Sequence, residues 1–302
     1  MSDAAVIQMR DVSKDYGAVR AVAGLNLSVS KGEIFGFLGP NGAGKTTAIR
    51  LLTGFICPTE GEIRVFGLDP WTDGVRLKQR LGFLPDDPSL YPGLRGEELL
   101  DYLGRLSSRD TRVRRRELCE RFELARTMLR RKIREYSHGM KQKLAIVQAM
   151  QHEPDLLIMD EPTTALDPLA QQAFFALLRE ATAGGCTVFF SSHVLSEAEQ
   201  LCERVGIIRE GSLVAVEEVE SLQRRKVRFM EVAFKGTPPD DISVPGVKTI
   251  SRNGLRWKLS VRDDINPVIR ALARYDLEDI VFDQPSLEDI FLEYYSAGKG
   301  GS

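Results

Sequence analysis

The sequence predicts an α/β fold with a mainly parallel sheet, an inserted helical subdomain and a small C-terminal α+β domain. Short apolar runs that suit buried strands alternate with segments of helical spacing, and this alternation is typical of a parallel sheet. Residues 95–150 are rich in Leu, Arg and Glu and contain few β-branched residues, which favours helices. Beyond about residue 221 the pattern changes to alternating strands and polar turns, which indicates a second domain.

The composition is that of an ordinary globular protein. Of the 302 residues, 43% are hydrophobic and 28% are charged, and the formal net charge is −2. These values exclude wholesale disorder, and the near-zero charge removes the main electrostatic reason to expect bulk nucleic-acid binding. No run approaches the roughly 18 apolar residues of a membrane span, and the N-terminus lacks the basic-then-apolar layout of a secretory signal. We therefore expect no membrane-spanning segment in this chain.

The first elements expected are strands at residues 6–10 and 25–29, separated by a polar turn. Residues 33–38 (EIFGFL) form an apolar run between glycines, which suits a buried strand. A glycine-rich loop follows, and then apolar residues recur at helical spacing in TTAIRLLTGF. The order strand, loop, helix places the loop at the carboxyl end of a buried strand.

The middle of the chain is expected to insert helices between strands. Residues 81–94 indicate a strand that runs into a proline-rich loop, and the helical subdomain is predicted from about residue 87 to residue 150. Buried strands are then predicted at residues 155–159 and 187–190. The amphipathic segment between them, residues 171–185, favours a helix that ends at a glycine pair.

Residues 204–219 favour a hairpin with the Glu210–Gly211 pair in its turn. We predict that this hairpin ends the first domain, residues 1–221. A small α+β domain is predicted at residues 222–296, followed by a flexible tail at residues 297–302.

Two patterns describe this second domain. Residues 255–261 alternate, and one face of the strand would carry Leu255, Trp257, Leu259 and Val261. The Asn253–Gly254 pair before them is a hairpin turn signal. Near the end of the chain, Ser286 is followed three residues later by Asp289, which resembles the capping box at the start of a helix.

The sharpest motif is GPNGAGKTT, which matches the pattern G-x-x-x-x-G-K-[ST] and lies between a predicted strand and a predicted helix. Glycines let the backbone wrap closely around a polyphosphate, and the following helix adds its positive N-terminal end. Lys45 is expected to reach the β- and γ-phosphates, and Thr46 to offer its hydroxyl to Mg²⁺. The predicted phosphate-binding residues are Gly39, Pro40, Asn41, Gly42, Ala43, Gly44, Lys45, Thr46 and Thr47.

A second motif, LLIMDEP at residues 156–162, ends an apolar run in an acidic pair. Acidic residues at the carboxyl end of a buried strand lie where α/β sheets bind ligands. Asp160 is the candidate carboxylate for Mg²⁺. Glu161, one residue on, can point at a water instead, so it is the candidate general base for hydrolysis.

In this order, with a helical insert between them, the two motifs resemble those of the nucleotide-binding subunits of ABC transporters. The run YSHGMKQ resembles the signature loop LSGGQ of that family, with matches at Ser137 and Gly139 and departures at Tyr136, His138 and Met140. The resemblance implies that Ser137 and Gly139 cap the γ-phosphate of an ATP held by another subunit. It also implies a P-loop NTPase core, with ATP and Mg²⁺ as cofactors.

The same resemblance places four further residues. Tyr16 resembles the aromatic residue that stacks on adenine, and His193 resembles the switch histidine that contacts the γ-phosphate. Asp167 resembles a residue of the loop that crosses the interface between two subunits. Asp86 stands where the family usually has Gln; it is a candidate metal ligand, and its charge should perturb the titration of the nearby acidic pair.

Three stretches resemble the ATP-binding subunits of daunorubicin-resistance-type exporters: YSHGMKQK, LGFLPDDPSLYPGLRGEELL and PSLEDIFLEYY. The resemblance implies an ATPase that powers a separate membrane permease, and it favours an exporter. Two copies would close around two ATP molecules and reopen after hydrolysis. The permease would dock on the loop at residues 85–94 and on the helical block, at the cytoplasmic face of the membrane. A homodimer and a heterodimer both remain open, and no nucleic-acid partner is expected.

Another class of function stays open, namely a soluble ABC-type ATPase that acts on nucleic acid or in assembly. Its support is two arginine-rich stretches, residues 112–121 and 130–134, which a solvated helix face also explains. Translation factors of the superfamily usually carry two nucleotide domains, whereas this chain carries one motif set. Chromosome-structure ATPases need a long coiled coil, and no sustained heptads occur here.

Overall fold

The computed structural model describes residues 5–107, 109–224, 227–239, 241–262 and 264–283. The chain divides into two compact units, residues 1–217 and residues 218–302. The capping box expected at Ser286 and Asp289 and the tail expected at residues 297–302 lie outside the described residues.

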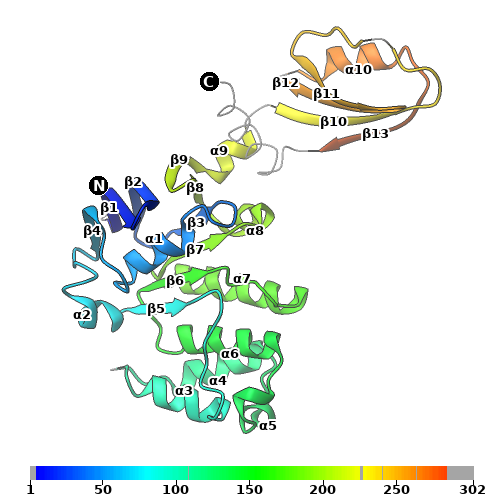
Figure 1. The fold of residues 1–302 in the computed structure, drawn as a ribbon. Helices are drawn as coiled ribbons and strands as arrows, with labels where there is room; N and C mark the ends of the chain where they lie inside the picture. The colour runs from blue at the N-terminus through cyan, green and yellow to red at the C-terminus, as the bar shows by residue number, and fades with distance from the viewer. Residues whose placement is uncertain (1–4, 108, 225–226, 240, 263, 284–302) are drawn as a thin grey trace. The chain divides into compact units, whose positions relative to one another are not determined.

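The first unit is built around a six-stranded sheet with the strand order β5-β6-β7-β3-β8-β9 (Figure 1). Its strands are β3 (Ile34–Leu38), β5 (Leu81–Leu84), β6 (Leu156–Asp160), β7 (Thr187–Ser192), β8 (Arg204–Arg209) and β9 (Ser212–Glu218). The pairs β5–β6, β6–β7, β7–β3 and β3–β8 are parallel. Every residue of β3, β6 and β7 is buried, which explains their continuous apolar runs. The mainly parallel sheet predicted from the sequence is confirmed.

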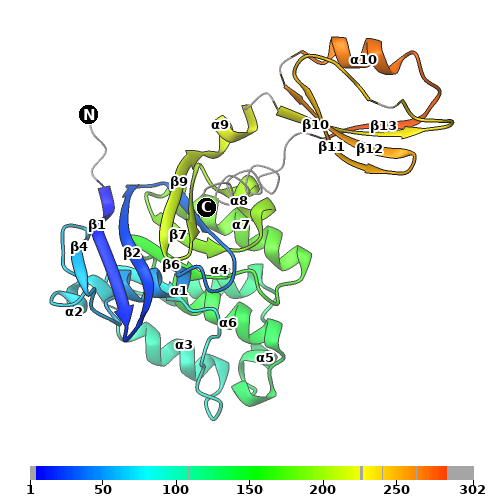
Figure 2. The same ribbon diagram turned by 45° about the horizontal axis from the view of Figure 1, so that its top comes forward.

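A separate antiparallel sheet has the order β2-β1-β4 and consists of β1 (Ala5–Tyr16), β2 (Val19–Ser30) and β4 (Glu60–Val65). Figure 2 shows β1 and β2 side by side, and both are longer than the predicted strands at residues 6–10 and 25–29. The β1–β2 register shifts between Met9 and Val12, and such bulges break the alternation by which a strand is recognised. The sequence does not predict β4 because its first three residues are exposed and it has no apolar run.

The helices of the first unit are α1 (Lys45–Leu52), α2 (Gly74–Lys78), α3 (Gly96–Gly104), α4 (Arg112–Arg121), α5 (Arg126–Leu129), the 3-10 helix η1 (Ile133–Glu135), α6 (His138–Met150), α7 (Pro168–Ala183) and α8 (Leu195–Leu201). Helices α3 to α6 gather at one end of the unit, where α3 and α4 both pack on α6 (Figure 1). Helix α7 packs on β7, and α8 packs on β3 and β7. Within the described ranges, no helix combines the length and the apolar character needed to cross a bilayer.

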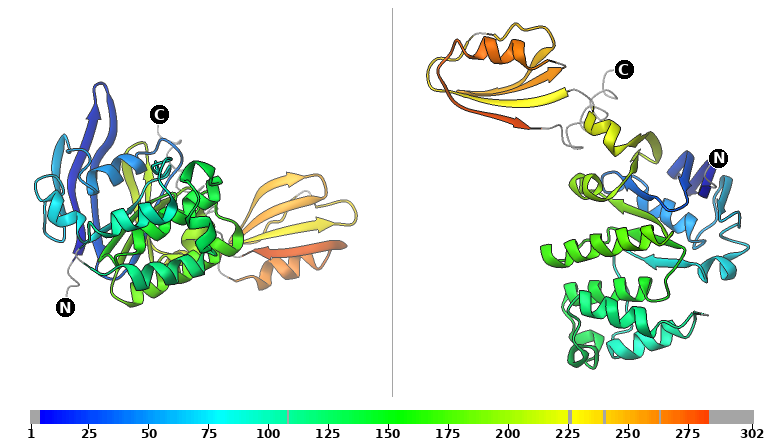
Figure 3. Two further views of the ribbon diagram at one scale, coloured as in Figure 1. Left: turned by 90° about the horizontal axis from the view of Figure 1, so that it is seen from below. Right: turned by 180° about the vertical axis from the view of Figure 1, so that it is seen from behind.

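The second unit contains a four-stranded antiparallel sheet, ordered β11-β12-β10-β13, with a helix on one face (Figure 3). Its elements are α9 (Val219–Arg224), β10 (Val227–Phe234), β11 (Val247–Asn253), β12 (Arg256–Arg262), α10 (Asn266–Leu272) and β13 (Leu277–Asp283). Side chains of β10 and β12 form a core of their own with Val268 and Leu272 of α10. This unit therefore does not need the first unit to bury its apolar face.

The turn predicted at Asn253–Gly254 is wrong by one residue. Asn253 pairs with Arg256, so the turn consists of Gly254 and Leu255, and Leu255 is 47% exposed instead of facing the core. Gly254 has a φ of 59°, and a two-residue turn with glycine in its first position suits this conformation. The other apolar residues of the predicted strand face, Trp257, Leu259 and Val261, are buried as expected.

Candidate active site

The loop between β3 and α1 follows a path that leaves no room for side chains at two glycines. Gly44 precedes α1 with a φ of 105°, in the left-handed region that favours glycine. A Cβ atom on Gly44 would lie 2.6 Å from the carbonyl oxygen of Ala21, and one on Gly39 would lie 2.5 Å from that of Ile208. The loop therefore packs directly on the backbone of β2 and β8, at the carboxyl end of a buried strand.

Lys45, the first residue of α1, reaches back to the loop. Its Nζ atom donates hydrogen bonds to the carbonyl oxygens of Gly39, at 2.6 Å, and Pro40, at 3.3 Å. The same atom lies 3.2 Å from Oε1 of Glu161, and Lys45 is only 6% exposed. The ammonium group is thus fixed beside the space that a loop-bound phosphate chain would occupy.

Glu161 connects Lys45 to His193. It follows β6 with a φ of 48°, a left-handed conformation that is uncommon outside glycine and tends to occur at functional sites. Its Oε2 lies 2.8 Å from Nδ1 of His193, the residue after β7. Because β6 and β7 are parallel neighbours, the residues that follow them meet at the same edge of the sheet. The structure therefore brings the predicted lysine, general base and switch histidine together.

Asp160, the last residue of β6, is held by a serine that the sequence analysis missed. The Ser191 hydroxyl donates a hydrogen bond to Oδ1 of Asp160 and accepts one from the N–H of Glu161, at 3.3 Å. Ser191 is completely buried, so water does not compete for these bonds. The only sequence signal is a pair of serines at the end of an apolar strand, just before His193.

A cleft of about 380 Å³ opens between these elements. Among the predicted site residues, those that line it are Pro40, Asn41, Gly42, Gly44, Lys45, Thr46, Thr47, Asp86, Asp160 and Glu161. Gly39 and Ala43 belong to the same loop but do not line the cleft. His193 does not line it either, but its ring contacts Glu161, which does. Tyr16 ends β1, is 45% exposed and pairs with Val19, which does line the cleft. The phosphate loop and the acidic pair thus face a common space.

The oxygen atoms that line this cleft suit a magnesium ion whose remaining ligands come from a phosphate substrate. The pKa of Asp86 is raised, chiefly by burial and then by the negative charges of Asp160 and Glu161, so carboxylates crowd together here. Thr46 and Asp160 supply hydroxyl and carboxylate oxygens, which Mg²⁺ prefers. In the described part of the chain, no group of three or more His, Cys, Asp or Glu residues is placed to hold a metal by itself. Substrate phosphates and water would supply the remaining ligands, as is usual for Mg²⁺.

Two further segments line the cleft and were not predicted to belong to the site. They are Arg20 with its neighbours at the start of β2, and the Glu210–Gly211 turn between β8 and β9. The N–H of Gly211 donates to the carbonyl of Ala43 at 3.0 Å, and the carbonyl of Gly211 accepts from Ala23 at 2.9 Å. The turn is therefore bonded to both the phosphate loop and β2. The sequence predicts the turn itself, but its neighbours depend on the strand order.

Ser137 and Gly139, at the start of α6, do not line the cleft of their own chain. Ser137 is the N-cap of α6, and its hydroxyl accepts a hydrogen bond from the N–H of Met140 at 3.3 Å. A Cβ atom on Gly139 would lie 2.9 Å from the carbonyl oxygen of Ala165. The loop before α7 therefore approaches the start of α6 closely.

Asp167 belongs to the same second cluster, because it caps α7 and contacts α6. Its carboxylate accepts a hydrogen bond from the N–H of Ala170 at 2.8 Å and lies 3.1 Å from Nζ of Lys143. These two contacts, the backbone bond first, lower the pKa of Asp167. Ser137 and Gly139, predicted to cap the ATP of another subunit, and Asp167, predicted to lie in the loop that crosses the interface, thus lie near one another and apart from the cleft.

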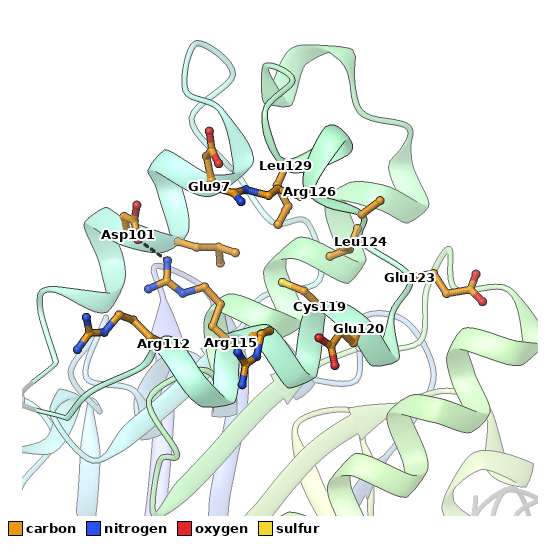
Figure 4. A pocket seen from close by; sticks show the side chains of 13 residues that line it. Glu97, Asp101, Arg112, Arg115, Cys119, Glu120, Glu123, Leu124, Arg126 and Leu129 are labelled. Atoms are coloured by element: carbon orange, nitrogen blue, oxygen red, sulfur yellow. Dashed lines mark hydrogen bonds and ion pairs between the residues drawn. The ribbon is translucent and has the colours of Figure 1, made fainter.

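A larger cavity of about 650 Å³ lies among α3, α4 and α5 and contains none of the predicted site residues (Figure 4). Its walls combine apolar side chains such as Leu124 with charged ones, and Arg115 forms an ion pair there with Asp101. Burial raises the pKa of the Cys119 thiol to about 11, so this thiol is a poor nucleophile at neutral pH. The cavity offers a surface of mixed character and no reactive group.

Known proteins are similar to this chain over most of its length. A family model described as "ABC transporter" matches residues 22–164. The daunorubicin resistance ATP-binding protein DrrA3 of Streptomyces coeruleorubidus is 34% identical over 306 residues, which cover 97% of this chain and 96% of that protein. The bacitracin transport ATP-binding protein BcrA of Bacillus licheniformis is 38% identical over 227 residues, which cover 75% of this chain and 74% of that protein.

Solved structures agree with this likeness. The ATP-binding subunit of an ABC transporter is 31% identical with a TM-score of 0.68, covering 72% of this chain and 92% of that one. A dimeric bacterial ABC transporter cassette is 26% identical with a TM-score of 0.65, covering 70% of this chain and 98% of that one.

Proposed function

Because this chain belongs to the ABC transporter family as an ATP-binding subunit, we propose that it hydrolyses ATP in the cleft to power a separate membrane permease. The observation that carries the proposal is the meeting of Lys45, Glu161 and His193 beside the phosphate loop. In the proposed reaction a water attacks the γ-phosphorus, the bond to the bridging oxygen breaks, and ADP and phosphate leave.

Each residue of the cleft has a distinct proposed role. The N–H groups of the loop and the start of α1 bind the polyphosphate, and Lys45 binds its β- and γ-phosphates. Glu161 accepts the proton of the attacking water, and His193 contacts the γ-phosphate. Thr46 and Asp160 would hold Mg²⁺, which would supply positive charge near the phosphates.

We assign the second cluster to the ATP of another copy. Tyr16 stacks on the adenine held by its own chain, whereas Ser137, Gly139 and Asp167 act across an interface. The support is their position outside the cleft and the likeness to a dimeric cassette at 26% identity. Two copies would close around two ATP molecules, and hydrolysis would let them part.

We place the permease on the loop at residues 85–94 and on helices α3 to α5, at the cytoplasmic face of the membrane. Tyr91, in the loop, and Tyr102, in α3, are more than half exposed, and residues of α3 to α5 line the cavity of Figure 4. The named functions of the relatives, daunorubicin resistance and bacitracin transport, favour an exporter.

The arginines of α4 give little support to a nucleic-acid partner, because most of them are paired with acidic side chains. The ion pairs are Arg112 with Asp110, Arg114 with Glu117, Arg115 with Asp101 and Arg121 with Glu180. Such a mixed-charge surface attracts a phosphate backbone weakly.

The test is phosphate release by the purified chain, alone and with its co-expressed membrane partner. With Mg²⁺ the wild-type chain should hydrolyse ATP, and Lys45→Ala should lower the rate by at least about 100-fold. Lys31→Ala, at an exposed lysine between β2 and β3, should keep the wild-type rate. A chain that neither binds nor cleaves ATP would overturn the proposal. Stimulation by DNA or RNA and not by the permease would overturn the transport role.

A further inference from the structure

His193 lies in a tight turn that its neighbours close. The hydroxyl of Ser192, the last residue of β7, accepts a hydrogen bond from the N–H of Val194 at 2.9 Å. A hydroxyl that bonds the N–H two residues on forms an ST-turn, which restricts the backbone of the residue between. The His193 side chain is 52% exposed, so packing does little to hold its ring. Its place beside Glu161 therefore depends on this turn.

The Ser192 hydroxyl is itself oriented by a buried glutamate. Oε2 of Glu197, in α8, accepts a hydrogen bond from Ser192 at 2.9 Å, and Glu197 is only 5% exposed. A hydroxyl has a single proton, and the carboxylate of Glu197 is a closer and charged acceptor than the carbonyl oxygen of Val194, which lies 3.5 Å away. With the proton donated to Glu197, a lone pair is left for the N–H of Val194. The carboxylate thus selects the arrangement of Ser192 that closes the turn.

The surroundings of Glu197 are not those of a stabilising ion pair. Within the described ranges, its side chain accepts hydrogen bonds from two neutral groups. These are the hydroxyl of Ser192 and the side-chain amide of Gln171, which donates to Oε1 at 3.0 Å. Burying a carboxylate without a cation costs free energy of folding, so stability alone does not explain this residue. Gln171 lies in the first turn of α7, whose N-cap is Asp167. The network therefore joins the backbone around His193 to α7.

We propose that Glu197 is a positioning residue for ATP hydrolysis, which holds His193 at Glu161 by way of Ser192. This inference rests on the proposed function, since it assumes that His193 takes part in hydrolysis. The phosphate loop meets this network at the backbone, where the N–H of Gly39 donates to the carbonyl oxygen of Ser192 at 3.4 Å. The side-chain bonds of Ser192 and Glu197 are separate from this contact, so replacing either side chain should leave the backbone bond, and with it ATP binding, in place. Loss of Glu197 should therefore slow the chemical step and leave the affinity for ATP unchanged.

The first test reads the position of the His193 ring without ATP. The chain has three histidines, and the spectrum of His193→Ala identifies which imidazole NMR signal belongs to His193. In Glu197→Ala that signal should move, whereas the signals of His138 and His152 should stay in place. Glu197→Gln has the same shape and can still accept a hydrogen bond, so it should restore most of the wild-type spectrum. An unmoved His193 signal in Glu197→Ala would overturn the inference.

The second test is a double-mutant cycle on ATP hydrolysis. In the wild-type background, Glu197→Ala should lower kcat about 10-fold and leave KM for ATP within about 2-fold. In the His193→Ala background it should cause no further loss, because the group that it positions is gone. An equal loss in both backgrounds would show a general structural role and contradict the inference.

Glu33→Gln is the matched control for both tests. Glu33 is also buried, but it lies just before β3 and pairs with Arg204. This variant should keep the wild-type kcat and histidine spectrum. If Glu197→Ala does not fold, Ser192→Ala replaces it in the same cycle, since it removes the relay and keeps the carboxylate. A folded wild-type chain with no ATPase activity would contradict the proposed function, whereas the NMR arm would still decide the placement of His193.

Discussion

Lys45 and Glu161 form a buried pair at the centre of the cleft, 3.2 Å apart. The γ-phosphate of ATP needs the same lysine, so substrate and carboxylate compete for one cation. When a phosphate forms an ion pair with Lys45, Glu161 would keep its contact with His193 and lose its contact with Lys45. Its Oε1 atom could then accept a hydrogen bond from a water. The pairing in the structure thus links substrate binding to the release of the base.

Glu161→Gln should separate these two effects. The neutral amide cannot accept the proton of water, so hydrolysis should fall by at least about 100-fold. It also competes less for Lys45, so ATP should bind at least as tightly as to the wild-type chain. Titration calorimetry and phosphate release would measure the two quantities. Hydrolysis at the wild-type rate would refute the assignment of Glu161 as the base.

Ser191→Ala should weaken the response to Mg²⁺. Asp160 loses the hydroxyl that orients it, and loss of such a supporting bond typically lowers metal affinity by about 10-fold or more. The Mg²⁺ concentration for half-maximal ATPase activity should rise accordingly. Thr182→Ala is the control, because its hydroxyl donates within its own helix, to the carbonyl oxygen of Leu178. An equal Mg²⁺ requirement in both variants would argue against the role of Ser191.

Gly44→Ala should destabilise the fold more than Gly17→Ala. Both glycines have positive φ, so each alanine pays for a left-handed backbone, about 1–2 kcal/mol. A Cβ on Gly44 also meets the Ala21 carbonyl at 2.6 Å, whereas nothing lies within 4 Å of one on Gly17. Urea unfolding of both variants would measure the difference in unfolding free energy. Equal losses would mean that the loop moves away from β2 at little cost.

At the scale of elements, burial decides what the sequence reveals. Strands β3, β6 and β7 are predictable because all their residues are buried and each strand contains a continuous apolar run. Strand β4 is not predicted, because half of its residues are exposed and it has no apolar run. The length of β1 is underestimated, because its bulges interrupt the alternation of apolar and polar residues. The cleft follows the same rule: its motif residues can be found in the sequence. The contacts of Ser191 and Gly211 within the site cannot be read from the sequence, because their partners are set by which strands become neighbours.

The start of α7 offers a pH test at this scale. The Ala170 N–H, and then Lys143, hold the pKa of Asp167 below its usual value. A carboxyl whose folded pKa is lowered stabilises the fold above its unfolded pKa, near 3.9, and loses this effect as the pH falls through the folded value. Asp167→Asn keeps a capping oxygen but removes the charge, so it should be less stable than wild type at pH 7. Urea unfolding between pH 7 and about pH 3 should show this gap closing; a gap that does not change with pH would contradict the account.

At the scale of the whole molecule, each unit buries a core of its own. The first unit centres on side chains of β1 to β3 and α1, and the second on β10, β12 and α10. We therefore expect a fragment of residues 1–217 to fold and to bind ATP within about 3-fold of the affinity of the full chain. Circular dichroism and nucleotide titration would measure both properties. A fragment that is unfolded, while the full chain binds ATP, would show that the second unit supports the cleft.

Ser137 and Asp167 stand outside the cleft that their own chain provides. On the proposed arrangement, every catalytic centre includes residues of a second copy of the chain. A variant inactivated at Lys45 and a variant inactivated at Ser137 would each form an inactive homodimer. A heterodimer of the two variants would contain one catalytic centre with both residues intact. Two defective alleles in one cell could thus complement each other, which an enzyme with all its parts in one chain does not allow.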